Sequence, residues 1–167
     1  MFFSGFCLKN DEELFLDYII KNNYTVNGFS YGAIKAFEYV YNAKERVDLL
    51  QLFSPAFFND KDIKYKRMQL MFFKKDSISY CNKFLENCGF SKKLKEKYFS
   101  MGSFEQLDEL LYYKWDKIKF QKLIEKGTRI EVYLGSEDKI IDSNKALEFF
   151  REFAEVYFIK GVGHILL

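Results

Sequence analysis

Histidine, proline and cysteine are scarce in this sequence, whose 167 residues include one His, one Pro and three Cys. The three cysteines, Cys7, Cys81 and Cys88, are odd in number and widely spaced, and no histidine cluster accompanies them. Such a set favours neither a disulfide framework nor a zinc site. We therefore expect no bound metal and no cofactor.

A strong charge of one sign and long apolar runs are lacking as well. The 26 basic and 24 acidic side chains leave a net charge of +2, which gives no electrostatic reason to expect nucleic acid as a partner. No apolar run approaches the length of a membrane span. The first residues lack the basic start, the long apolar stretch and the cleavage site of a signal peptide. We expect a cytoplasmic protein without a membrane partner.

Aromatic residues, in contrast, are abundant, with 20 Phe and 12 Tyr. We interpret them as a Phe-rich core rather than as an aromatic binding platform. The length suits one domain, residues 1–167, with a substantial core, and does not favour two full domains.

Short apolar segments alternate with amphipathic ones near both ends of the chain. Strands are expected at Met1–Phe3, Tyr24–Phe29, Val47–Phe53, Arg129–Leu134 and Glu155–Ile159. Helical spacing of apolar residues occurs in Asp11–Asn22 (with Asn10 or Asp11 as its cap), Tyr31–Asn42 and Ser143–Phe153. This alternation predicts an α/β fold, in which a parallel sheet of about five strands has right-handed crossovers and helices on both faces.

The section from about 56 to 126 interrupts this alternation. It has no obvious strand, and the only proline, Pro55, stands at its start. Helical periodicity runs instead through Lys61–Lys75, Ser77–Asn87, Lys92–Phe99 and Phe104–Glu125. We expect a helical insertion that forms a cap over the carboxyl edge of the sheet, where ligands bind in open α/β folds.

The segment Gly28-Phe29-Ser30-Tyr31-Gly32 joins an expected strand to an expected helix. A serine on such a sharp turn holds its hydroxyl clear of the backbone, and the two glycines let the strand and the helix approach closely. Ser30 is therefore our candidate nucleophile. A hydroxyl of this kind needs a nearby base that takes its proton.

The only imidazole that could act as this base belongs to His164, in a glycine-rich loop after the last expected strand. The base needs a carboxylate that fixes its tautomer and stabilises the imidazolium. Two adjacent acids, Glu137 and Asp138, follow the strand that ends at Leu134. We prefer Asp138, with Glu137 as the alternative and Asp142 third, because Asp142 has the position of a helix cap.

Acyl transfer also requires hydrogen-bond donors for the oxyanion that forms in the transition state. The backbone N–H of Tyr31, next to the nucleophile, is expected to supply one of them. The loop after the first strand, Ser4-Gly5-Phe6-Cys7, is expected to supply the other, with the N–H of Phe6 as the candidate.

The nucleophile Ser30, the acid Asp138 and the base His164 follow one another along the chain in this order. In this respect the sequence resembles the α/β-hydrolase superfamily. Within it, the sequence is similar to the short, BioV-type pimeloyl-acyl-carrier-protein methyl ester esterases of biotin synthesis. The similarity extends through the loops of the acid and the histidine to the end of the chain. Its most specific parts are Phe2-Phe3-Ser4-Gly5-Phe6, the segment Gly28–Ala36 and Leu52-Phe53-Ser54-Pro55.

The resemblance implies a serine carboxylesterase that hydrolyses the methyl ester of pimeloyl-acyl-carrier protein and releases methanol. It also implies a truncated α/β-hydrolase fold. The roles that it carries over are Ser30 as nucleophile, His164 as base, Asp138 as the acid that orients the base, Phe6 and Tyr31 as oxyanion donors, and Gly5, Phe29 and Tyr31 as substrate contacts, with Phe29 lining the acyl pocket.

The chain departs from the superfamily pattern in two ways. Ser4 stands where many relatives have His, and Cys7 stands where they often have Gly. The first strand also corresponds to the third strand of the relatives, which is why the implied sheet is truncated. Both departures concern the geometry of the first loop more than the chemistry of the triad.

Acyl carrier protein is acidic, so the resemblance implies basic residues that attract it to the mouth of the site. The insertion offers Lys61, Lys64, Lys66, Arg67, Lys74 and Lys75, which fit a solvated helix face equally well. Two other activities use the same triad, a thioesterase and a general short-chain carboxylesterase. A non-catalytic binding protein on the same fold is a further alternative.

Overall fold

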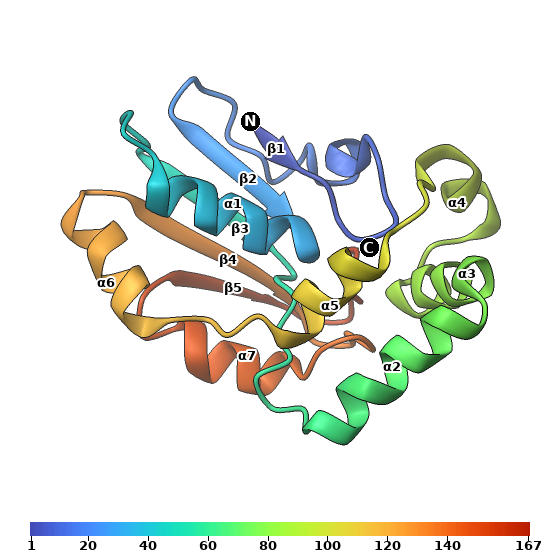
Figure 1. Cartoon of the computed structure of the whole chain (residues 1–167). Helices are drawn as coiled ribbons and strands as arrows, with labels where there is room; N and C mark the ends of the chain where they lie inside the picture. Colours follow the sequence, from blue (N-terminus) through green and yellow to red (C-terminus); the bar gives the residue numbers. More distant parts are fainter.

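Five parallel strands form one sheet, in which they lie side by side in the order of the sequence (Figure 1). The computed structural model describes all residues from 1 to 167. The strands are β1 (Phe2–Phe3), β2 (Thr25–Phe29), β3 (Leu49–Phe53), β4 (Arg129–Gly135) and β5 (Glu155–Ile159). The predicted α/β fold with about five parallel strands is confirmed. Because the strands are parallel, their carboxyl ends all lie at one edge of the sheet.

Strands β2 and β3 are buried along their whole length, as expected of strands that are covered on both faces. The helices that pack on one face are α1 (Tyr31–Asn42), α6 (Lys117–Glu125) and α7 (Ser143–Phe150). The ring of Phe120 on α6 contacts those of Phe37 on α1 and Phe150 on α7, with centroids 4.4 and 5.9 Å apart. Burial of each ring contributes roughly 1.5–3 kcal/mol, so an aromatic core holds these three helices on the sheet.

The other face of the sheet carries a row of aromatic side chains. Strand register aligns four of them across β2 to β5, namely Phe29, Phe53, Tyr133 and Tyr157. The 3-10 helix η1 (Asp11–Phe15) covers this row, because the ring of Phe15 stacks on that of Phe53 with centroids 4.8 Å apart.

The prediction of an α-helix over Asp11–Asn22 is wrong. Only the start of this segment is helical, as the short 3-10 helix η1, and the rest is not. The cause is Gln51 of β3, whose side chain is fully buried. Its amide oxygen accepts from the backbone N–H of Ile20, and its amide nitrogen donates to the carbonyl of Tyr18, both at 3.0 Å. A continued helix would pair these backbone groups internally, so the glutamine replaces the helical hydrogen bonds.

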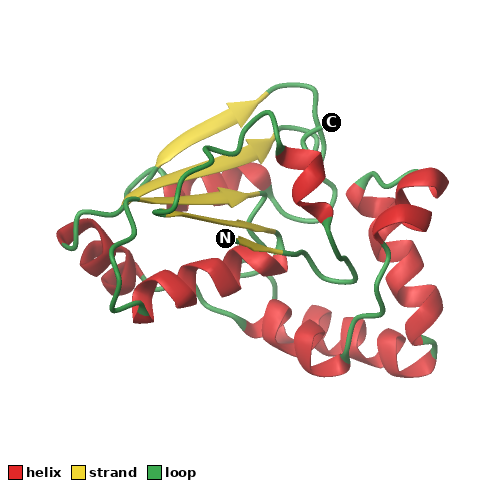
Figure 2. Ribbon diagram, turned by 90° about the horizontal axis from the view of Figure 1, so that it is seen from above, coloured by secondary structure: helices red, strands yellow, loops and turns green.

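Four helices lie beyond the carboxyl edge of the sheet and form its cap: α2 (Ile63–Lys75), α3 (Ser77–Cys88), α4 (Lys92–Tyr98) and α5 (Phe104–Tyr112). Figure 2 shows a group of helices set apart from the sheet, on the side to which the strands point. Each cap helix begins after a residue whose side chain accepts from a backbone N–H of the first turn, namely Asp62, Asp76, Ser91 and Ser103. None of the helices combines the length and the apolar character that a membrane crossing requires.

The predicted helical stretch Phe104–Glu125 is divided in the structure into α5 and α6. Between them, Trp115 is buried in the core, and its indole N–H donates to the carbonyl of Ala56 at 2.9 Å. Asp116 then begins α6 by accepting from the N–H of Ile118. Helix α6 packs on α1 and β4, so it is a crossover helix of the sheet layer. The segment predicted as one insertion therefore contains both this helix and the cap, which consists of α2 to α5.

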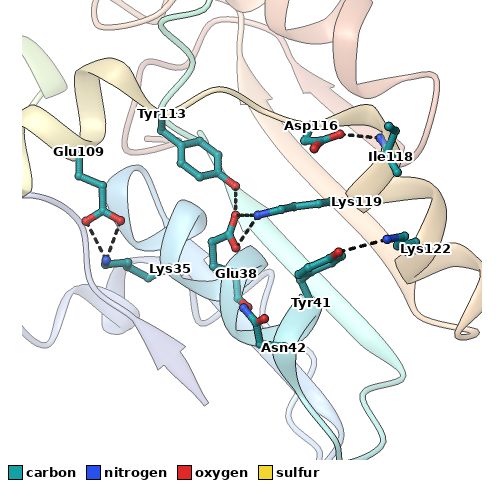
Figure 3. A network of polar contacts seen from close by, with 10 residues as sticks. All are labelled: Lys35, Glu38, Tyr41, Asn42, Glu109, Tyr113, Asp116, Ile118, Lys119 and Lys122. Atoms are coloured by element: carbon teal, nitrogen blue, oxygen red, sulfur yellow. Dashed lines mark hydrogen bonds and ion pairs between the residues drawn. The ribbon is translucent and has the colours of Figure 1, made fainter.

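Two carboxylates tie α5 and α6 to α1 (Figure 3). Glu109 of α5 accepts from the ammonium group of Lys35, which lies 2.7 Å from each carboxylate oxygen. Glu38 of α1 accepts from Lys119 of α6, at 2.7 and 2.8 Å, and from the hydroxyl of Tyr113. The α5 end of the cap is therefore attached to the sheet layer by charged contacts.

Candidate active site

Ser30 occupies the turn between β2 and α1, with φ 52° and ψ −112°. A positive φ is costly for a residue that has a Cβ, so the neighbouring backbone must enforce it. The N–H of Ser30 donates to the carbonyl of Phe53 at 2.9 Å, and its own carbonyl accepts from the N–H groups of Ala33 and Ala56. Ser30 thus has the strained backbone of a strand-to-helix elbow.

The two glycines of the elbow are required by close approaches of the backbone. A Cβ at Gly32 would lie 2.0 Å from the carbonyl oxygen of Phe3, at the end of β1. A Cβ at Gly28 would lie 2.3 Å from the carbonyl oxygen of Gly32. Backbone atoms cannot move aside as the tip of a flexible side chain can, so only glycine fits either position.

A chain of two hydrogen bonds joins the side chains of Ser30, His164 and Asp138. Nε2 of His164 lies 2.9 Å from Oγ of Ser30, and Nδ1 lies 2.6 Å from Oδ2 of Asp138. An ionised carboxylate can only accept, which assigns the imidazole proton to Nδ1 and leaves Nε2 to accept from the serine hydroxyl. Ser30 and His164 are each 1% exposed. The structure brings together the three residues that the sequence singled out.

The loop after β4 distinguishes Asp138 from the two other acids. Oδ1 of Asp138 accepts from the backbone N–H groups of Ile140 and Ile141, at 2.7 and 3.1 Å, which leaves Oδ2 directed at the imidazole. Glu137 is exposed. Asp142 accepts from two backbone N–H groups at the start of α7, so its predicted role as a helix cap is confirmed.

Gly135 allows the loops of the acid and the histidine to touch. A Cβ there would lie 2.3 Å from the carbonyl oxygen of Gly163, next to His164. The N–H of Glu137 also donates to the carbonyl of Val162 at 2.9 Å. Backbone contacts, in addition to the hydrogen bond between the side chains, therefore set the distance between the acid and the histidine.

The backbone N–H groups of Phe6 and Tyr31, our candidate oxyanion donors, donate to no acceptor within the protein. The elbow places the N–H of Tyr31 next to the nucleophile. Phe6 follows β1, which pairs with β2 through Phe3 and Gly28. Two N–H groups that are free of protein acceptors can bind an anionic oxygen without losing an internal hydrogen bond.

Asp11, the first residue of η1, contacts the loop after β1, and the sequence analysis missed this contact. Asn10 or Asp11 is expected as a helix cap, but Asn10 makes no capping bond and Asp11 accepts from the N–H of Gly5 at 3.0 Å. Burial raises the pKa of Asp11, and hydrogen bonds from Ser4 and Gly5 offset only part of that rise. Its other oxygen, Oδ1, is buried without a partner. No local pattern signals this contact, because it depends on the path of the loop.

Three residues were expected to contact substrate, and the structure places them as follows. Phe29 is buried against the imidazole of His164, with ring centroids 5.2 Å apart. The hydroxyl of Tyr31 donates to Glu109 of the cap at 2.7 Å. Gly5 is packed against the ring of Phe29, which a Cβ would approach to 2.8 Å. Phe29 therefore supports the histidine, Tyr31 supports the cap, and Gly5 lets the loop after β1 pack on Phe29.

All three cysteines are buried and free. No group of three or more His, Cys, Asp and Glu side chains lies close enough together to hold a metal ion.

Comparison with solved structures defines the class of fold. The chain resembles the esterase EaEST from Exiguobacterium antarcticum with a TM-score of 0.63 at 18% identity, over 84% of this chain and 59% of the esterase. It resembles BioG from Haemophilus influenzae with a TM-score of 0.61 at 15% identity, over 98% of this chain and 87% of BioG. Naproxen esterase from Bacillus subtilis gives a TM-score of 0.55 at 18% identity, over 85% and 53% of the two chains.

These similarities show that the chain has the α/β-hydrolase fold, in agreement with the resemblance noted from its sequence. Within that fold, the solved structures to which it is similar include carboxylesterases and BioG. The chain spans little more than half the length of several of these esterases. No family model matches the sequence, and no curated protein matches it either.

Proposed function

We propose that this protein is a serine hydrolase of carboxylic esters, with Ser30 as nucleophile, His164 as general base and Asp138 as the acid that orients the base. The observation that carries the proposal is the continuous pair of hydrogen bonds from Ser30 through His164 to Asp138. Such a geometry activates a serine hydroxyl that is otherwise a weak nucleophile. The esterases of the same fold support the class of reaction.

In this mechanism, Oγ of Ser30 attacks the ester carbonyl carbon while Nε2 of His164 takes the hydroxyl proton. The N–H groups of Phe6 and Tyr31 stabilise the negative charge on the carbonyl oxygen. The tetrahedral intermediate then expels the alcohol, which receives the proton from His164. A water molecule, deprotonated by the same imidazole, attacks the acyl-enzyme, so that the carboxylic acid leaves and Ser30 regains its proton.

The substrate that we propose is the methyl ester of pimeloyl-acyl-carrier protein. Support comes from the sequence resemblance and from the fold shared with BioG, which matches over almost the whole chain. Helix α2 adds a surface suited to an acidic carrier, because Lys64, Arg67, Lys74 and Lys75 are exposed and form no ion pair. Two of the six basic residues considered above are otherwise engaged, since Lys61 pairs with Asp60 and Lys66 is buried.

The test separates this substrate from the other reactions of the same triad. The purified protein is incubated with pimeloyl-acyl-carrier-protein methyl ester, and the carrier is analysed by mass spectrometry. We expect loss of the methyl group with the acyl chain retained, and no reaction with Ser30→Ala. Loss of the whole acyl chain would instead indicate a thioesterase. Cleavage of simple aryl esters alone would indicate a general carboxylesterase.

A growth experiment tests the same proposal in cells. The gene should restore growth without biotin to bacteria that lack their own pimeloyl ester esterase, and the Ser30→Ala variant should not. A non-catalytic binding protein on this fold would give no turnover of any ester, with Ser30→Ala and the unmodified protein behaving alike.

A further inference from the structure

The buried position of the nucleophile raises the question of how an ester reaches it. Ser30 and His164 are each 1% exposed, and the cap lies beyond the edge of the sheet at which they meet. A substrate with a long acyl chain therefore requires a passage through or beside the cap. Two adjoining cavities between α2, α3 and α5 offer one.

The outer cavity is a groove between α2 and α3, with a volume of about 390 Å³. The inner cavity has a volume of about 140 Å³ and is lined mainly by apolar residues of the cap, among them Tyr65, Leu107, Leu110 and Leu111. The two cavities share four lining residues, namely Gln69, Tyr80, Phe84 and Asn87. The two cavities therefore adjoin at these four side chains, between α2 and α3.

The walls of the inner cavity contact both sides of the candidate active site. Phe84 packs edge-on against the ring of Phe6, with centroids 5.3 Å apart, and Phe6 belongs to the candidate oxyanion loop. Ile140 lines the same cavity, and its backbone N–H donates to Asp138. The inner cavity is therefore lined by residues that contact the oxyanion loop and the loop of the acid.

A single hydrogen bond lies where the cavities adjoin. The hydroxyl of Tyr80 on α3 donates to the side-chain oxygen of Gln69 on α2 at 2.8 Å. A partly buried hydrogen bond between neutral groups contributes about 1 kcal/mol, so thermal motion can break it. The pair can act as a latch between α2 and α3. The two helices otherwise meet through apolar contacts, such as that of Phe73 with Tyr80.

The mouth of the outer cavity combines cationic and apolar groups. Lys75 and Lys83 line it together with Phe72, whose side chain is 46% exposed. Two carboxylates face the lysines: Asp76 caps α3 by accepting from a backbone N–H, and Glu86 lies 3.6 Å from Lys83. Lys75 forms no ion pair, so it is available to an anionic group at the outer end of a substrate.

We propose that a linear acyl chain reaches Ser30 through this passage between α2 and α3, past the Tyr80–Gln69 latch, with an anionic group of the substrate near Lys75 at the mouth. The proposal rests on the ester hydrolysis proposed above and names the route and the specificity residues of that same site. The shared lining residues decide how long an acyl chain the enzyme accepts. A short ester does not need to fill the passage.

The test narrows the passage and compares a long ester with a short one. Asn87 lines both cavities from the exposed side of α3, so Asn87→Trp should obstruct the passage with little effect on folding. Asn82→Trp, on the same helix but lining neither cavity, is the matched control. We expect kcat/KM for p-nitrophenyl octanoate to fall by about tenfold or more in Asn87→Trp. Hydrolysis of p-nitrophenyl acetate should stay within about twofold, and the control should resemble the unmodified protein in both.

A second variant tests the latch itself. Tyr80→Phe keeps the ring but removes the hydroxyl that donates to Gln69, so kcat/KM for the octanoate should rise while that for the acetate stays unchanged. The passage would be refuted if Asn87→Trp hydrolysed the octanoate normally, or if a folded Asn87→Trp lost both esters equally. An unchanged octanoate rate in Tyr80→Phe would refute the latch.

A binding measurement keeps this proposal separate from the proposed function. If the unmodified protein hydrolysed neither ester, the proposed function would fail, and the passage would be tested with the fluorescent chain dansyl-undecanoate. Weaker binding to Asn87→Trp than to Asn82→Trp would then support the passage as a binding site for acyl chains. Equal binding to the two variants would refute it.

Discussion

The carboxyl edge of the sheet and the cap above it are built in opposite ways. At the edge, β2 and β3 are buried at every residue, and backbone atoms meet so closely at Gly32 and Gly135 that no side chain fits. In the cap, α2 buries only Lys66 and Phe73 among its 13 residues. Close backbone contacts therefore hold the edge, whereas contacts between side chains hold the cap helices.

This difference separates two tasks within one site. Catalytic groups need positions held within a fraction of an ångström, and the edge provides them through strands, an elbow and two touching loops. In the proposed passage, selection of the acyl chain depends on side chains of the cap helices. Changes at the edge should therefore affect all esters alike, and changes in the cap should depend on the acyl chain.

The largest effect is expected at His164. No other imidazole exists in the chain, so His164→Ala should lower kcat by about 10⁴-fold or more. The loss should be the same for a short and a long ester, because the base acts on the ester group alone. Steady-state kinetics with p-nitrophenyl acetate and p-nitrophenyl octanoate measure it, and circular dichroism verifies that the variant is folded. A loss confined to the longer ester would contradict the separation of edge and cap.

A large effect on stability, rather than on chemistry, is expected at Gly32. The added Cβ of Gly32→Ala would lie 2.0 Å from the backbone oxygen of Phe3, and we expect a loss of more than about 3 kcal/mol. Urea unfolding measures the loss. Gly127→Ala is the control, because Gly127 has φ +86° but nothing within 4 Å of the added atom, so backbone strain alone should cost about 1 kcal/mol. Equal losses in the two variants would show that the edge is less rigid than we infer.

The sequence predicted the strands, the elbow and the cap helices α2 to α4 within about two residues of their ends, and it missed the features that depend on distant contacts. The helix after the elbow was predicted at its observed bounds, Tyr31–Asn42, because apolar spacing and the elbow are local signals. The break before α6 was missed, since it depends on the contact of Trp115 with Ala56, 59 residues away. The short η1 was missed for the same reason, because Gln51 of a distant strand takes the hydrogen bonds of the expected helix.

The smallest effect is expected at Glu109, where the cap is attached to the sheet layer. Burial would raise the pKa of Glu109, but hydrogen bonds from Lys35 and Tyr31 outweigh it and hold the pKa below its ordinary value of 4.5. A carboxyl group with a lowered pKa in the folded state stabilises the fold above its unfolded pKa and loses this contribution as the pH falls through its folded pKa. Glu109→Gln should therefore lower the free energy of unfolding at pH 7. Because Glu109 and Lys35 are each 40% exposed, the loss should be below about 1 kcal/mol.

The pH dependence of this loss distinguishes an ion pair from simple packing. The difference in unfolding free energy between the unmodified protein and Glu109→Gln should shrink as the pH is lowered below 4.5, the ordinary pKa of the group. Asp108→Asn, an exposed neighbour on the same helix, is the control and should show little difference at either pH. A difference that persisted in acid would mean that Glu109 holds α5 through packing and neutral hydrogen bonds. In that case the charged contacts of Glu109 would not explain how α5 is attached to the sheet layer.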